Sequence, residues 1–168
     1  GTDSIPAIYQ LEDSYKAIGL IGASVPATEH SVMCMGTKES EINTFKRLLD
    51  LYPTGILSVV SDTWVLWKVC TEYLPLLKDQ ILARDGKLVI RPDSGDPVDI
   101  ICGLSDDTIT IDRSDMGPVR KGVIELLWDV FGGTVNDQGY KVLDSHIGAI
   151  YGDSITLERA KQICERLK

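Results

Sequence analysis

The chain has 168 residues, of which 43% are hydrophobic and 25% charged, a composition that is ordinary for a globular protein of one domain. The formal net charge of −8, with no cluster of Lys and Arg, argues against a general nucleic-acid binder or an anionic-membrane binder. No apolar run approaches the ~18 residues of a membrane span, and no N-terminal pattern indicates a signal peptide, so we expect a cytoplasmic protein.

The hydrophobic pattern alternates between strands and helices along the chain. Residues 1–13 show few periodic signals, and 104–117 indicate a small excursion or hairpin. In chain order we predict a strand at 16–23, a helix at 39–51, a strand at 56–62, helical segments at 63–73 and 75–83, a strand at 88–90, a short helix at 97–103, a helix at 117–132, strands at 140–143 and 146–153, and a final helix capped by Thr156.

Apolar side chains mark the faces that these helices are expected to bury. On the helix at 39–51, one face carries Ile42, Phe45, Leu48 and Leu49. Trp64 and Trp67 lie three positions apart, and we expect them to pack from one helical face rather than to form a stacking platform for a base.

The cysteines are expected to be free thiols. The chain has 4 of them, widely spaced and without a CxxC pair. A zinc site or a disulfide framework needs tighter grouping, so buried thiols in a reducing compartment are favoured for Cys34, Cys70, Cys102 and Cys164.

Acidic residues follow the predicted strands in a repeated way: Asp62, Asp93 and Asp153 each come at the end of an apolar run. Alternating strands and helices predict an α/β fold with mainly parallel strands and crossover helices. Because the carboxyl ends of parallel strands meet at one rim, we expect a site there. These rules fit a barrel and an open sheet equally well.

The stretch LVIRPDSGDP at 88–97 is the most informative part of this pattern. A buried strand is followed by Arg91, whose planar guanidinium suits phosphate or carboxylate, and by Asp93, which can orient a sugar hydroxyl or face a developing positive charge. Pro92 and Pro97 stiffen the turn. A surface ion pair in a tight turn is the alternative on the local pattern alone.

Several short blocks occur together in a characteristic order: GTD at 1–3, SVPATEHS at 24–31, SVVSD at 58–62, IRPDSGDP at 90–97 and YGDSI at 151–155. In this order and approximate spacing the sequence resembles the nicotinamide phosphoribosyltransferases of the type II phosphoribosyltransferase family, with a divergent stretch at 104–135. The resemblance implies roughly half of that family's α/β barrel-like domain. Because the chain begins Gly-Thr-Asp, without Met, we expect 1–168 to be a single domain cut from a larger catalytic chain.

The resemblance implies transfer of a phosphoribosyl group from phosphoribosyl pyrophosphate to nicotinamide, which gives nicotinamide mononucleotide and pyrophosphate. Such chemistry needs carboxylates near the ribose, and Asp62 and Asp93 are the candidates. For Asp62, the alternative is a helix N-cap ahead of Thr63. In the family, the histidine that matches His30 accepts a phosphoryl group from ATP, whereas an isolated histidine is more often structural. We take His146, which lies in no such block, as structural.

Further site residues follow from the resemblance alone. Asp3 matches the acid that binds the nicotinamide carboxamide, and an acid there disfavours the anionic nicotinate. Arg91, with Pro92 shaping its turn, is expected at the ribose phosphate or the base. Gly152 and Asp153 match a pair that contacts the nucleotide ribose, and a plain strand-to-helix turn is the local alternative.

The resemblance also implies Mg²⁺ with the pyrophosphate, and a homodimer in the full-length enzyme. It places other phosphate-binding residues of the family outside this chain, so we expect the isolated chain to be inactive. The alternatives are a nicotinate-specific enzyme, a non-catalytic binding module that kept the fold, and a glycoside hydrolase whose carboxylate pair would be Asp62 and Asp93.

Overall fold

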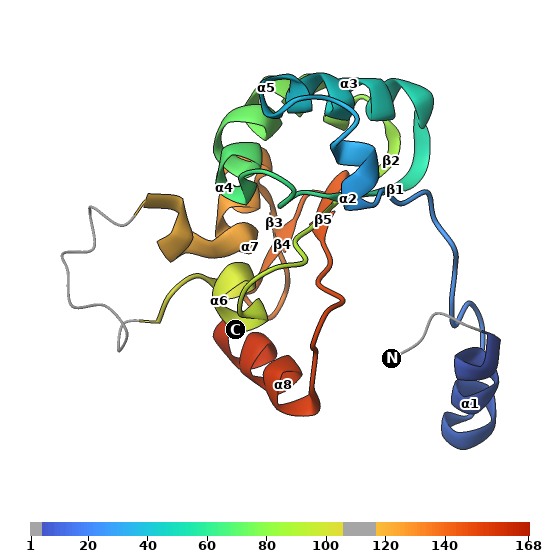
Figure 1. Cartoon of the computed structure of the whole chain (residues 1–168). Helices are drawn as coiled ribbons and strands as arrows, with labels where there is room; N and C mark the ends of the chain where they lie inside the picture. The colour runs from blue at the N-terminus through green and yellow to red at the C-terminus, as the bar shows by residue number, and fades with distance from the viewer. Residues whose placement is uncertain (1–4, 106–116) are drawn as a thin grey trace.

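The computed structural model describes residues 5–105 and 117–168 (Figure 1). Asp3 and nearly all of the excursion predicted at 104–117 therefore lie outside the described residues, as does the early part of the divergent stretch. Among the described residues, no helix is long and apolar enough to cross a membrane.

A parallel sheet of three strands forms the centre of the fold. Its order is β1 (Thr54–Val60), β2 (Asp85–Arg91) and β5 (Ile147–Ala149). An isolated parallel bridge between Ala27 and Ser58 adds the segment before α2 to the outer side of β1. The predicted parallel α/β arrangement is confirmed, and among the described residues the sheet is open rather than closed into a barrel.

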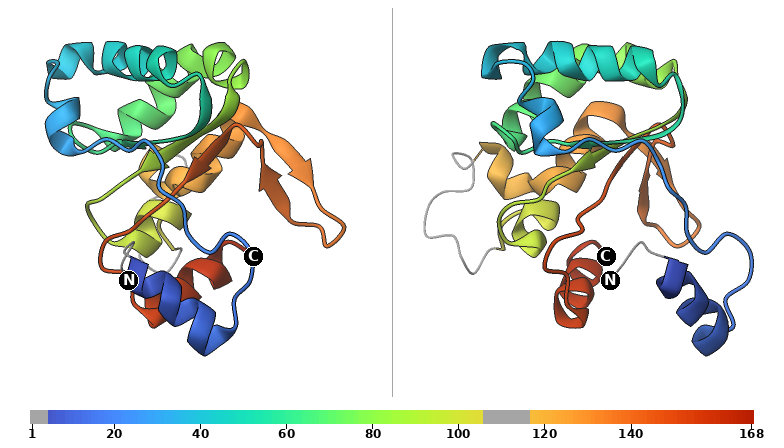
Figure 2. Two further views of the ribbon diagram at one scale, coloured as in Figure 1. Left: turned by 90° about the vertical axis from the view of Figure 1, so that its right-hand side faces the viewer. Right: turned by 45° about the vertical axis from the view of Figure 1, so that its right-hand side comes forward.

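The remaining elements connect or flank these strands (Figures 1 and 2). In chain order they are α1 (Ile5–Tyr15), α2 (His30–Met33), η1 (Lys38–Ser40), α3 (Glu41–Leu51), α4 (Leu66–Lys68), η2 (Val69–Tyr73), α5 (Leu74–Leu82), α6 (Pro97–Cys102), α7 (Gly117–Phe131), β3 (Gly133–Val135), β4 (Lys141–Leu143) and α8 (Leu157–Arg166). The segment η2 is a π-helix, and α4, η2 and α5 follow one another without a break. Strands β3 and β4 form an antiparallel hairpin.

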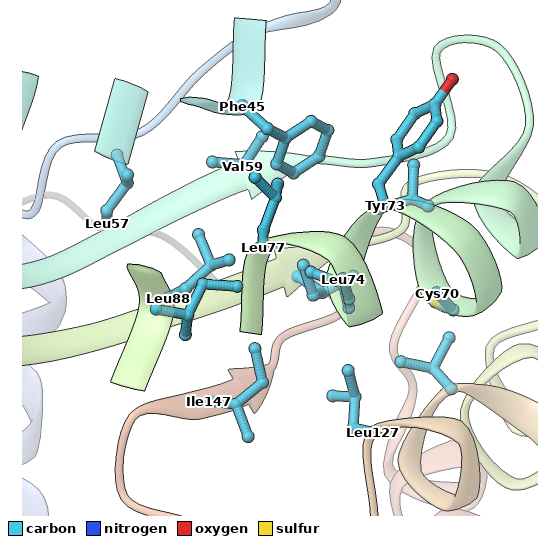
Figure 3. Close-up of a cluster of buried hydrophobic side chains, with 14 of the residues drawn as sticks. Phe45, Leu57, Val59, Cys70, Tyr73, Leu74, Leu77, Leu88, Leu127 and Ile147 are labelled. Carbon is cyan, nitrogen blue, oxygen red and sulfur yellow. The ribbon is translucent and has the colours of Figure 1, made fainter. Parts of the chain in front are cut away.

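The core lies on one face of the parallel sheet. The register pairs Leu57 with Leu88 and Leu88 with Ile147, so these side chains share that face. In Figure 3 they lie among buried side chains of α3, η2, α5 and α7, and the labelled core residues there are Phe45, Leu57, Val59, Cys70, Tyr73, Leu74, Leu77, Leu88, Leu127 and Ile147. Fully burying one such Leu or Phe stabilises the fold by about 2 kcal/mol. On the opposite face, Ser58 and Val60 of β1 are buried, whereas Val89 and Arg91 of β2 are only partly buried.

Most predicted helices are confirmed, with shifted ends. The helix expected at 39–51 appears as η1 and α3, and it ends at Tyr52 as predicted. Thr156 caps α8, because its hydroxyl accepts a hydrogen bond from the backbone N–H of Arg159. Helix α7 is kinked at Gly122. Its φ of 72° is a left-handed backbone conformation that glycine adopts with little steric strain.

Two sequence predictions at the N-terminal side and around α4 are wrong. Residues 16–23 form no strand, and Ile18 and Leu20 are 95% and 88% exposed, because no described strand lies beside them to accept their backbone hydrogen bonds. The segment 5–13, which showed few periodic signals, belongs to α1, a helix with no buried residue. Trp64 precedes α4 in a bend and is exposed, so it shares no helical face with Trp67.

The cysteines are free, as predicted, but not all of them are buried. Cys70 lies in the core, and burial raises the pKa of its thiol to about 12. Cys102 is half-buried, whereas Cys34 and Cys164 are exposed, so the prediction of buried thiols is wrong for these two.

Candidate functional site

The carboxyl ends of the three parallel strands deliver the predicted acids to one edge of the sheet. Strand β1 ends at Val60 ahead of Asp62, β2 ends at Arg91 ahead of Asp93, and β5 ends at Ala149 ahead of Asp153. The in-register pairing of Val60 with Arg91 places the first two acids on adjacent strand ends. The parallel sheet therefore creates the rim that the strand pattern predicted.

His30 lies between two of these carboxylates. Its Nε2 is 3.6 Å from Oδ2 of Asp93 and 3.9 Å from Oδ1 of Asp62. The imidazole side chain is 42% exposed, so one side of the ring faces solvent. Its Nδ1 lies 2.9 Å from the hydroxyl oxygen of Thr63. Residues from the start of α2 and from two strand ends thus form one cluster.

Asp62 is the buried member of the cluster, with a side chain only 7% exposed. Its Oδ2 accepts a hydrogen bond of 2.8 Å from the backbone N–H of Asp93, which ties the loop after β2 to the end of β1. Its Oδ1 is buried without a hydrogen-bond partner in the described part of the chain. Because α4 begins only at Leu66, with Val65 as its N-cap residue, Asp62 is not a helix cap.

Arg91 is anchored beside the segment that carries His30. Its Nη2 donates a hydrogen bond of 2.7 Å to the carbonyl of Thr28 and lies 3.4 Å from Oε2 of Glu29. The side chain is only 20% exposed, and its Nε is buried without a partner among the described residues. Pro92, next in the chain, is buried. Arg91 is therefore not simply one member of a surface ion pair, because its buried Nε–H has no hydrogen-bond partner among the described residues.

The segment after β5 is joined to the loop after β2. The hydroxyl of Tyr151 donates to the carbonyl of Gly95 at 2.9 Å. Burial, followed by the charges of the surrounding carboxylates, raises the pKa of this tyrosine; the carboxylates are Asp153, Asp62, Asp93 and Asp96. These shared charges place Tyr151 near the same acidic rim.

Gly152 and Asp153 directly follow this tyrosine on an exposed stretch. A Cβ added at Gly152 would meet no atom within 4 Å, so the chain itself does not require glycine there. Asp153 accepts a hydrogen bond from the hydroxyl of Ser154, and the structure shows no direct contact of its side chain with His30. The predicted pair therefore lies at the rim without joining the histidine cluster.

The cluster can bind a cationic or donor-bearing group and hold an imidazole for nucleophilic chemistry. In the described part of the chain, Oδ1 of Asp62 within the cluster and Nε of Arg91 are buried without a hydrogen-bond partner, and each is energetically costly until a partner binds. Among the described residues, no group of three or more His, Cys, Asp or Glu side chains is arranged to hold a metal ion by itself.

Sequence reasoning missed Thr63 and Tyr151 as members of this region. Thr63 directly follows a predicted site acid, and its position at a strand end was the signal that was available. Tyr151 opens the YGDSI block. His146, taken as structural, pairs with Asp144 at 2.7 Å and contacts none of the predicted site residues.

Comparisons with known proteins agree with one another. The model of the nicotinate phosphoribosyltransferase family matches residues 1–168. Among curated proteins, the nicotinamide phosphoribosyltransferase of Acinetobacter baylyi is 53% identical over 175 residues, covering 100% of this chain and 34% of the relative. The enzyme of that name from Mycoplasma pneumoniae is 45% identical, covering 89% of this chain and 32% of the relative. The one from Xanthomonas campestris pv. campestris is 32% identical, covering 99% and 32%. The chain thus spans about a third of the length of these relatives.

Proposed function

The chain belongs to the nicotinate phosphoribosyltransferase family, and on this premise we propose that it contributes part of an active site for NAD salvage. The reaction is transfer of the phosphoribosyl group from phosphoribosyl pyrophosphate to nicotinamide. The bond between ribose C1 and the pyrophosphate oxygen breaks, the ring nitrogen of nicotinamide bonds to C1, and nicotinamide mononucleotide and pyrophosphate leave. The relatives are named nicotinamide phosphoribosyltransferases, and this favours nicotinamide over nicotinate as the base.

The observation that carries this proposal is the convergence of His30, Asp62 and Asp93 at the carboxyl ends of adjacent parallel strands. Positive charge develops on the ribose as the pyrophosphate departs, and fixed carboxylates stabilise that charge. Asp62 suits this role because its side chain is anchored to the backbone of Asp93 and its Oδ1 has no hydrogen-bond partner among the described residues. A glycoside hydrolase would also need two carboxylates, but here an imidazole lies between them.

His30 is the proposed acceptor of a phosphoryl group from ATP. Half-exposure of the ring admits a second substrate, and a neutral imidazole is a competent nucleophile near pH 7. In this step a ring nitrogen bonds to the γ-phosphorus of ATP, the bond to the β,γ-bridging oxygen breaks, and ADP leaves. The phosphorylated ring would then add negative charge at the rim where Arg91 is anchored to Thr28 and Glu29.

Mg²⁺ fits this site as an ion carried by the pyrophosphate. It prefers oxygen ligands and is commonly bound through one or two carboxylates together with substrate phosphates. Asp62 and Asp93 offer such carboxylates, and the buried Oδ1 of Asp62 lacks a partner among the described residues. When bound, the ion would neutralise charge on the leaving pyrophosphate.

The other predicted residues take substrate-binding roles in this proposal. Arg91, with Pro92 fixing its turn, would bind the ribose phosphate or the base. Gly152 and Asp153 would contact the nucleotide ribose from the exposed side of the rim. Asp3 would accept a hydrogen bond from the nicotinamide carboxamide.

The proposal extends to the architecture of the longer protein. The open sheet would be part of the family's barrel-like domain, since its exposed strand edges can accept further strands. We further propose that the isolated chain has little or no turnover, because the relatives are about three times as long. A homodimer and a cytoplasmic location belong to the same proposal.

Calorimetric titration of the chain with nicotinamide mononucleotide, with and without Mg²⁺ and pyrophosphate, tests the proposal. We expect saturable binding that Asp93→Ala weakens at least tenfold, because a hydrogen bond to a charged group contributes about 1.5–3 kcal/mol. Asp137→Ala is the matched control, since Asp137 is an exposed aspartate at the tip of the β3–β4 hairpin.

Equal binding by both variants would contradict the assignment of this rim to the nucleotide. Absence of binding by the folded wild-type chain would show that the affinity lies in other segments of the enzyme. A turnover assay of the chain alone, with nicotinamide and phosphoribosyl pyrophosphate, tests the expected inactivity directly.

A further inference from the structure

Thr63 makes a contact that none of the predicted roles explains. Its hydroxyl oxygen lies 2.9 Å from Nδ1 of His30, across a separation of 33 positions in the sequence. The imidazole has only two nitrogens, and the other one, Nε2, faces Asp62 and Asp93. Thr63 therefore contacts Nδ1, the ring nitrogen that does not face the carboxylates.

The position of Thr63 is well fixed. It follows Asp62, whose Oδ2 accepts a hydrogen bond from the backbone N–H of Asp93, and it lies three residues after Val60, the last residue of β1. The dipeptide 62–63 thus contacts two separate segments, the loop after β2 and the start of α2. A side chain on such an anchored segment can hold a ring in one orientation at a small cost in conformational entropy.

We propose that Thr63 is a positioning residue for His30, holding Nδ1 so that Nε2 stays directed at Asp62 and Asp93. The meaning of this role for catalysis rests on the proposed function, in which His30 is the nucleophile. The orientation itself does not depend on that function and can be measured separately.

A hydroxyl is suited to this task because it can both donate and accept. When the neutral ring carries its proton on Nε2, the hydroxyl of Thr63 donates to Nδ1. When the ring carries a proton on Nδ1, as it must for Nε2 to act as the nucleophile, the same oxygen accepts from Nδ1–H. The contact can therefore persist through a reaction cycle. A carboxylate could only accept from the ring and an amide N–H could only donate to it, so each would lose the contact in one protonation state.

Nitrogen NMR of the histidine rings tests the orientation. The chain has only 2 histidines, so ¹⁵N-histidine labelling gives two sets of ring signals, and His30→Ala assigns them. His146 is an internal reference, because its Nδ1 is bonded to Asp144 at 2.7 Å and must donate to that carboxylate. Unchanged His146 signals in a variant show that the fold is retained.

Thr63→Val replaces the hydroxyl with a methyl group of similar size, and Thr63→Ser restores the hydroxyl. We expect the valine variant to move the Nδ1 resonance of His30 while His146 stays unchanged, and the serine variant to return it toward the wild-type position. A His30 resonance that is the same in the valine variant and the wild type would overturn the proposal.

Labelling of His30 by [γ-³²P]ATP is the second readout. We expect about a fivefold loss in Thr63→Val, which corresponds to one lost hydrogen bond, and near-complete rescue in Thr63→Ser. If the wild-type chain takes up no label, the proposed nucleophilic role of His30 fails in this chain, and the NMR result still decides whether Thr63 positions the ring. If the wild-type chain is labelled, equal labelling of the two variants overturns the positioning role.

Discussion

Glu41 gives a quantitative prediction about stability, because it is a buried carboxyl group outside the candidate site. It is the first residue of α3, is 1% exposed, and its Oε1 has no hydrogen-bond partner among the described residues. Burial raises the pKa of Glu41 from 4.5 to about 7, and the positive charge of Lys68 opposes this only in part.

The sign follows from proton linkage. The folded protein holds the Glu41 proton more tightly than the unfolded chain does, since the folded pKa is the higher one. The stabilisation is fully present below pH 4.5 and is lost as the pH rises through about 7. One pKa unit corresponds to about 1.4 kcal/mol, so at most about 3 to 4 kcal/mol disappears across this window, and roughly 2 to 3 kcal/mol of it between pH 5 and 8.

Urea unfolding of the wild type and Glu41→Gln at pH 5 and pH 8, followed by tryptophan fluorescence, measures this effect. Glutamine carries no titrating proton, so its contribution to stability does not respond to this pH change. The free energy of unfolding of the variant minus that of the wild type should therefore be about 2 to 3 kcal/mol higher at pH 8 than at pH 5. Comparing the two pH values cancels any constant cost of burying the amide. The control is Glu12→Gln, because Glu12 lies exposed on α1. A difference between variant and wild type that is the same at both pH values would refute the reasoning.

Three further predictions concern the backbone, a helix cap and the substrate. Gly86→Ala should prevent folding or cost more than about 3 kcal/mol, because its Cβ would lie 2.0 Å from the carbonyl of Gly55 on the adjacent strand, whereas Gly152→Ala should leave the thermal midpoint unchanged. Thr156→Ala should lower the free energy of unfolding by about 1 kcal/mol in urea titrations, through loss of the α8 cap. In the longer enzyme, Asp3→Ser should raise the ratio of kcat/KM for nicotinate to that for nicotinamide; an unchanged ratio would remove Asp3 from base selection.

Local sequence patterns predicted the elements that build the sheet and its covering helices. The strand at 56–62 was recognisable as a short β-branched run, and α3 by apolar residues on one face, because these periodicities arise from the backbone geometry of each element alone. The same reasoning fails where burial depends on distant partners. Residues 16–23 are apolar enough for a strand, but no described strand lies beside them, and Trp64 lies outside the helix that its spacing suggested.

The sequence by itself determined which chemical groups this protein has and that three of its acids follow strands. Only the tertiary structure decided which of those groups meet. The parallel register of β1 and β2 brings Asp62 beside Asp93, and the bridge between Ala27 and Ser58 leads the chain to His30 at the same edge. The tertiary structure also brings the hydroxyl of Thr63 next to the imidazole of His30, which lies 33 positions away in the sequence. Such contacts depend on strand pairing between distant segments, and the local hydrophobic periodicity of a segment does not indicate which other segment it will pair with.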